Sequence, residues 1–141
     1  MLTSLLINTF IIALVVLIHY EFLSRLTAMI PKFRKIHRVR ILIGLFGSLV
    51  AHIIEIWIFA VGYYFMVKSG GFGTLTGNFE STLVDCVYFS FVTYTSLGIG
   101  DIAPIGNIRF LAGLESLTGL VLITWTASFL YIEMRHYWDK P

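Results

Sequence analysis

The sequence has little charge. Only 13% of its 141 residues are Asp, Glu, Lys or Arg, whereas a globular domain carries about 25%. Apolar residues make up 57% of the chain. A chain of this composition cannot cover a compact surface with polar groups, so we expect most of it to face lipid or other apolar surfaces. An ordinary soluble domain is thereby excluded.

Other features are missing as well. Cys86 is the only cysteine, which excludes an internal disulfide and indicates a small buried residue. No apolar segment carries arginines at three-residue spacing, so there is no voltage sensor. We find no internal repeat, low-complexity tract or second domain.

Three apolar stretches are long enough to cross a bilayer: residues 1–24, 41–67 and 108–133. At about 1.5 Å per residue, each helix exceeds a hydrocarbon core of about 30 Å. The first stretch has no basic residue before its apolar part and no small-residue cleavage pattern. We therefore interpret it as a retained transmembrane helix and not as a signal peptide.

The segment between the last two spans is of another kind. Residues 81–94 are apolar and aromatic but too few to cross the membrane, which favours a re-entrant helix. Residues 95–101 follow directly and are rich in glycine and hydroxyl groups. Irregular backbone at membrane depth survives only when it is buried in protein or lines water. We therefore predict a pore loop, preceded by a glycine-rich outer turret at residues 68–80. A monomer this small cannot enclose a route across the bilayer, so we expect an oligomer.

Six of the ten basic residues lie within residues 25–40. They are Arg25, Lys32, Arg34, Lys35, Arg38 and Arg40. Such a run is typical of a segment that binds nucleic acid or anionic lipid. Because apolar spans flank this one, we interpret it as a cytoplasmic loop, with anionic lipid and not nucleic acid as its possible partner. The N-terminus and the pore loop then lie outside and the tail at 135–141 inside, in a multi-pass protein of the bacterial inner membrane.

The stretch Thr93–Asp101 has the sequence T-Y-T-S-L-G-I-G-D. It resembles the signature T-x-T-T-V-G-Y-G-D of the potassium-channel pore family. The resemblance covers residues 41–134 and implies an outer helix, a pore helix, a selectivity filter and an inner helix, with four copies around one axis. The first span lies outside it. The resulting fold prediction is an all-α membrane protein with three transmembrane helices, a re-entrant pore helix and a selectivity-filter loop.

The chemistry of the loop agrees with this resemblance. An ion that enters a filter sheds its water, so oxygen ligands must replace the hydration shell. Successive carbonyls can all point toward the pore axis only if alternate residues adopt backbone conformations that glycine tolerates. Gly98 and Gly100 have that spacing. The resemblance implies an ion-binding filter from Thr95 to Gly100, with K⁺ held by the carbonyls of Ser96, Leu97, Gly98 and Ile99 and by the Ser96 hydroxyl. It implies no cofactor besides the conducted potassium ion.

Three side chains depart from the family pattern. Ser96 keeps the hydroxyl of the usual threonine, and Leu97 replaces valine. Ile99 replaces a tyrosine whose hydroxyl braces the filter in the family. Backbone ligands survive all three changes, so we predict a potassium channel, with a nonselective cation channel as the alternative.

Several residues are candidates for supporting the filter. Tyr88 and Val92 share a face of the pore helix, and Asp101 closes the motif. Glu55 lies three residues after His52 on one face of the second span, and Glu115 lies within the third. Charges inside a membrane are costly and face a partner or water. Two interpretations stay open: a buried cluster that holds the outer and inner helices together, or a brace behind the filter that makes conduction sensitive to pH.

The third span carries the candidates for gating. Gly119 stands where the family often has a hinge glycine, although a small residue for close helix packing is an equal alternative. The family register places Leu120, Ile123, Thr124, Ala127 and Tyr131 along the cavity below the filter. We expect Trp125 to point away, toward neighbouring helices.

Two rivals belong to other classes. Residues 98–101 also fit the G-x-G-D pattern of intramembrane aspartyl proteases, but that chemistry needs a second carboxylate, and the candidates Asp85, Asp139, Glu55 and Glu115 suit it poorly. A non-conducting membrane adaptor is the other rival. We expect no enzymatic activity. His19, Glu21 and His37 are interpreted as interfacial residues, without a metal site.

Overall fold

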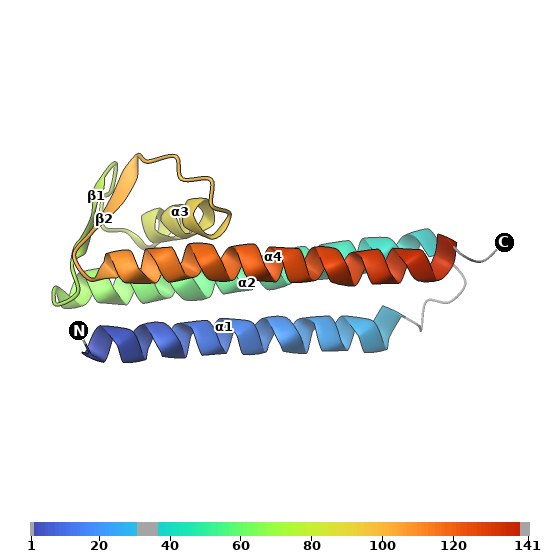
Figure 1. Ribbon diagram of the computed structural model, residues 1–141. Helices are drawn as coiled ribbons and strands as arrows, with labels where there is room; N and C mark the ends of the chain where they lie inside the picture. The colour runs from blue at the N-terminus through green and yellow to red at the C-terminus, as the bar shows by residue number, and fades with distance from the viewer. Residues whose placement is uncertain (1, 31–36, 139–141) are drawn as a thin grey trace.

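The computed structural model describes residues 2–30 and 37–138 (Figure 1). In chain order the elements are α1 (Leu2–Met29), α2 (His37–Ser69), β1 (Thr74–Gly77), α3 (Leu83–Tyr94), β2 (Ile102–Ile105) and α4 (Ile108–Trp138). The helices α1, α2 and α4 are each long and apolar enough to cross a membrane. The predicted all-α membrane fold is therefore confirmed.

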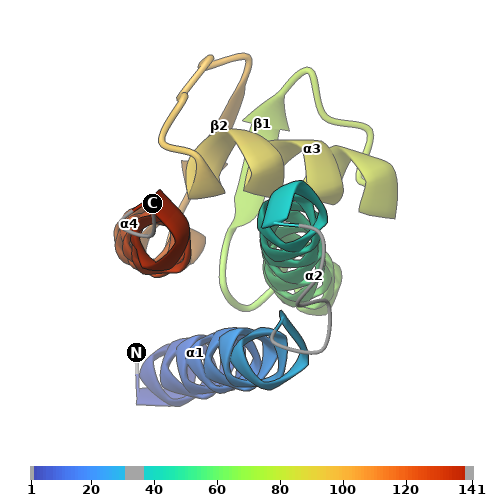
Figure 2. The same cartoon turned by 90° about the vertical axis from the view of Figure 1, so that its right-hand side faces the viewer.

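The three long helices run side by side, with α3 and the two strands at one end of the bundle (Figure 1). Seen along the helices, α1 lies on one side of α2 and α4, and α3 lies on the opposite side (Figure 2). Apolar side chains from α1, α2 and α4 fill the space between them, including the buried Val15, Phe59, Leu111 and Leu122. Each long helix also exposes large apolar side chains, as expected for helices that face lipid or a second subunit.

The two short strands were not predicted. β1 pairs with β2 in antiparallel register, with Thr74 opposite Ile105 and Gly77 opposite Ile102. The N–H of Asn78 also donates to the carbonyl of Asp101, at 2.9 Å. The expected turret is thus tied to the segment that follows residues 95–101. Strands of four residues with one buried side chain each are too short to give a periodic signal.

The helices extend beyond the expected spans. α1 ends at Met29 instead of residue 24, α2 begins at His37 instead of residue 41, and α4 ends at Trp138 instead of residue 133. The added turn of α1 carries Arg25, whose side chain is 82% exposed, so its aliphatic stem continues the helix while its charged end reaches water.

The interpretation of residues 25–40 as one basic loop is therefore wrong at both ends. Arg25 lies in α1 and pairs with Glu21 at 3.5 Å. Arg40 lies in α2, is 6% exposed, and its Nη2 lies 4.0 Å from Oε2 of Glu133 on α4. The rest of the predicted loop, residues 31–36, lies outside the described residues.

Candidate functional site

The first turn of α3 is fixed by a capping box. The Thr82 hydroxyl accepts from the N–H of Asp85 at 3.1 Å, and the Asp85 carboxylate accepts from the N–H groups of Thr82 (3.3 Å) and Glu80 (2.9 Å). These hydrogen bonds hold the pKa of Asp85 below its usual range, and the bond with Thr82 contributes most to this shift. The negative charge also lies at the helix N-terminus, where the helix dipole favours it. The opposite, electronegative end of α3 therefore faces the loop that begins at Thr95.

That loop alternates between two backbone conformations. The φ angles of Ser96, Gly98 and Gly100 are +57°, +58° and +86°, all in the left-handed region, and those of the intervening Leu97 and Ile99 are not. Both predicted glycines thus have the positive φ that was expected of them. Ser96 adopts a positive φ that the sequence did not indicate, because L-residues avoid this region at a cost of about 1–2 kcal/mol.

Two groups hold Ser96 and its neighbours in place. The Ser96 hydroxyl lies 2.8 Å from the hydroxyl of Ser116 on α4. The carbonyl of Val92, on the last turn of α3, accepts from the N–H groups of Leu97 (3.0 Å) and Gly98 (3.3 Å). Val92 thus contacts the loop through its backbone, although the sequence suggested its side chain.

Tyr88 reaches the far end of the loop. Its hydroxyl interacts with the carboxylate of Asp101, and this interaction raises the pKa of Tyr88. The loop is therefore held to α3 at its start by Val92 and at its end by Tyr88.

Many side chains near the loop are uncovered in the single chain. Leu97 and Ile99 are 67% and 57% exposed. The residues predicted to line a cavity are also exposed along α4: Leu120, Ile123, Thr124, Ala127 and Tyr131. Trp125 points to α1, where its ring centroid lies 5.3 Å from that of His19. In the single chain, the loop and the side of α4 that carries these residues are therefore both exposed.

Glu55 lies at the centre of a buried polar network behind α3. Its Oε1 is 2.8 Å from Nδ1 of His19, and its Oε2 is 3.1 Å from Nδ1 of His52. The hydroxyl of Tyr94, the last residue of α3, donates to the same Oε2. His52 Nε2 lies 3.0 Å from the hydroxyl of Thr126 on α4. The network therefore joins all three long helices to the residue directly before the loop.

Glu115 belongs to a separate network. Its carboxylate accepts from the hydroxyls of Tyr63 on α2 and Ser90 on α3. Ser90 also lies 2.9 Å from the carbonyl of Ile56. Glu115 thus joins α4 to α2 and to the middle of α3. The residues expected to form one cluster form two, and both of them contact α3 as well as the long helices.

The interpretation of His19 as interfacial is wrong. Its side chain is fully buried. Helix α1 brings it to Glu55 from a position 36 residues away in the sequence, so no local pattern could have shown this contact. Glu21 is half-exposed, as expected for a surface residue, and the side chain of His37 lies outside the described residues.

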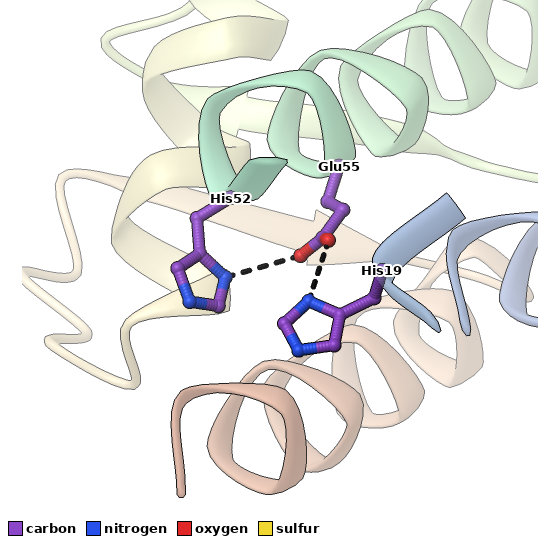
Figure 3. Close-up of side chains that lie close together, drawn as sticks. All are labelled: His19, His52 and Glu55. Atoms are coloured by element: carbon purple, nitrogen blue, oxygen red, sulfur yellow. Dashed lines mark hydrogen bonds and ion pairs between the residues drawn. The ribbon is translucent and has the colours of Figure 1, made fainter. Parts of the chain in front are cut away.

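Figure 3 shows His19, His52 and Glu55 with their polar ends directed at one another. One ligand atom from each of the three lies within 4.8 Å of the other two. Two imidazole nitrogens and a carboxylate oxygen are ligand types that zinc and other transition metals accept. Among the described residues, this is the cluster whose composition and spacing suit a metal ion.

Gly119 packs against the end of α3. A Cβ atom at this position would lie 2.2 Å from the carbonyl oxygen of Tyr94, which is far inside contact distance. Of the two interpretations of this glycine, close packing has direct structural support.

The protease interpretation gains no support from the geometry. Asp101 interacts with the Tyr88 hydroxyl, Asp85 caps α3, and Glu55 and Glu115 bind partners in their own networks. Asp139 lies outside the described residues. A pair of carboxylates that share a proton is therefore not formed among these described candidates.

A family model described as "Ion channel" matches residues 41–136, well over half of the chain. The match runs from α2 to α4 and leaves α1 outside it, as the sequence resemblance implied. No curated protein and no solved structure matches.

Proposed function

The chain belongs to the ion-channel family, and we propose that it forms a tetrameric potassium channel whose ions pass along the backbone of residues 95–100. In this proposal the carbonyls of Ser96, Leu97, Gly98 and Ile99 replace the hydration shell of K⁺. The protein moves ions passively and needs no cofactor.

The observation that carries the proposal is the alternation of positive φ at Ser96, Gly98 and Gly100. A chain that alternates in this way can turn successive carbonyls toward one axis, as a row of ion sites requires. The electronegative end of α3 at Tyr94 leads into this row and favours a cation over an anion.

The tetramer is supported by what a single chain leaves uncovered. The side chains of Leu97 and Ile99 and the exposed face of α4 at Ile123 and Tyr131 are apolar or aromatic. In a fourfold assembly, neighbouring subunits and a central cavity occupy this side of the molecule. Helix α1 lies on the opposite side from α3 (Figure 2), so it surrounds the pore and does not line it.

Orientation in the membrane follows from charge. The ends of α1 and α4 and the start of α2 lie together at the end of the bundle opposite to the strands (Figure 1). Arg25 and Arg40 lie in the segments that lead to this end. We infer that this end is cytoplasmic, with the N-terminus and the strands outside, and that anionic lipid is its partner in a bacterial inner membrane.

A nonselective cation channel is the second candidate, because Ile99 has no hydroxyl with which to brace the filter. Its side chain is instead 57% exposed. The Tyr88–Asp101 and Val92–Gly98 contacts are the supports that would compensate for it.

Reconstitution in liposomes tests the proposal. Flux is measured under a potassium gradient and under a sodium gradient, with protein-free liposomes as the blank. Flux of K⁺ well above Na⁺ supports the potassium channel, and equal flux supports the second candidate. No flux of either ion contradicts the proposal. A protein that conducts in liposomes but is a monomer in detergent contradicts it as well.

A further inference from the structure

We propose that His19, His52 and Glu55 form a binding site for a divalent transition-metal ion of the zinc type, held between α1 and α2 directly behind the pore loop. The cluster lies outside the predicted filter. It uses α1, the helix that the family match leaves out.

The spacing of the ligand atoms fits such an ion. A tetrahedral zinc ion with bonds of about 2.0–2.1 Å holds its ligand atoms about 3.3 Å apart. In the structure Nδ1 of His19 lies 2.8 Å from Oε1 of Glu55, and Nδ1 of His52 lies 3.1 Å from Oε2. The three ligand atoms lie within 4.8 Å of one another, so the widest separation has to close by about 1.5 Å around one ion.

The outer nitrogens of both rings are already oriented for metal binding. Nε2 of His52 lies 3.0 Å from the Thr126 hydroxyl, and Nε2 of His19 lies 3.5 Å from the same oxygen. A histidine that binds a metal through one nitrogen usually donates its other N–H to a second group, which fixes the ring. With the proton of each ring on Nε2, the Thr126 hydroxyl oxygen accepts from His52 and, at the longer distance, from His19, and both Nδ1 lone pairs are then free for the ion.

A fourth ligand is at hand. The Tyr94 hydroxyl lies 2.9 Å from Nδ1 of His52 and bonds to Glu55. This phenol, or a water molecule in its place, completes four-coordination. The Glu55 carboxylate offsets one of the two positive charges of the ion, and the side chain of His52, 12% exposed, is the accessible edge of the cluster. The ion binds unprotonated Nδ1 atoms, so any proton held there is released to solvent on binding.

The consequence for conduction rests on the proposed function. An ion bound here links α1 and α2 to Tyr94, the residue directly before Thr95. We infer that it stiffens the support of the filter and thereby changes flux.

The test uses the full chain, purified in detergent and stripped with a chelator. Zn²⁺ is titrated by calorimetry, and Co²⁺ is added separately so that its visible absorption reports the ligand set. We expect one ion per chain, loss of binding in His19→Gln and in His52→Gln, and binding about 10-fold to 100-fold weaker in Thr126→Val. Thr126→Ser, which keeps the hydroxyl, should restore the affinity.

Two matched controls test whether a histidine or a buried carboxylate outside the cluster contributes to Zn²⁺ binding. His136→Gln changes a histidine near the C-terminal end of α4, and Glu115→Gln changes the carboxylate of the other buried network. Both should bind Zn²⁺ like the wild type. The site is disproved if the wild type binds no Zn²⁺ saturably, or if a folded His19→Gln or His52→Gln variant binds it equally well.

Each histidine variant tests the site independently, and Thr126→Val leaves all three ligands in place. If one variant fails to fold, the others still test the proposal. The binding measurement does not depend on conduction. A protein that binds Zn²⁺ but passes no ions keeps the metal site and contradicts the proposed function. A protein that conducts but does not bind Zn²⁺ does the reverse.

Discussion

The carbonyl oxygen of Tyr94 lies against the Cα of Gly119, so close that a methyl group on that glycine would come within 2.2 Å of it. This contact joins the end of α3, where the loop begins, to the middle of α4. The hydroxyl at the end of the Tyr94 side chain donates to Glu55 on α2. One residue thus transmits the positions of both helices to the start of the loop.

Replacing Gly119 with alanine should displace the end of α3. Overpacking of this kind costs about 1–3 kcal/mol, so we expect a lower Tm in detergent and reduced potassium flux. Gly113→Ala is the control, because it lies on the same helix and a Cβ there meets nothing within 4 Å. It should match or slightly exceed the wild type in Tm. Equal behaviour of the two variants would show that α4 does not need this close approach.

Gly98→Ala tests the loop conformation alone. Within one subunit a Cβ at this position meets nothing within 4 Å, so only the positive φ opposes the substitution there. The strain of about 1–2 kcal/mol should distort the carbonyl row and abolish selective potassium flux in liposomes. Gly71→Ala adds the same methyl group outside the loop, again without a contact, and should conduct normally. Wild-type selectivity in Gly98→Ala would refute the proposed filter.

Tyr94→Phe removes the hydroxyl between His52 and Glu55. A buried carboxylate that loses its donor costs about 1–3 kcal/mol, so we expect a lower Tm and a smaller ratio of potassium to sodium flux. Tyr20→Phe, on the exposed face of α1, should change the unfolding free energy by no more than about 0.5 kcal/mol. If Tyr94→Phe lowers the Tm but leaves the flux ratio unchanged, the network holds helices together without bracing the filter.

Asp85→Asn should show an acid-dependent effect. Because folding lowers the pKa of Asp85, its stabilising contribution is complete above the unfolded value of about 3.9 and disappears as the pH falls through the lower folded value. The variant should therefore have a lower Tm than the wild type at pH 7, and the two should converge in strong acid.

The control for the capping box is Glu80→Gln. Only the backbone N–H of Glu80 bonds to Asp85, so this substitution should leave the difference between pH 7 and strong acid unchanged. A Tm for Asp85→Asn equal to that of the wild type at pH 7 would mean that the box does not stabilise α3.

Much of the fold could be predicted because its signals are local. Length and apolarity identify a membrane helix without knowledge of its neighbours. The spacing of Gly98 and Gly100 predicts where the backbone adopts a positive φ. The helix ends were placed less well, since Arg25 and Arg40 continue helices beyond the apolar residues. The pairing of β1 with β2 was missed because each strand is only four residues long.

The sequence by itself determined the three spans, the short helix, the loop at residues 95–101 and the family. Only the tertiary structure decided that His19 meets Glu55, that Glu115 belongs to a different network, and that Gly119 lies under the Tyr94 carbonyl. The reason is physical. Periodicity, length and turn chemistry act between neighbours in the chain, whereas these contacts depend on how separate helices rotate and pack against one another, which no local pattern specifies.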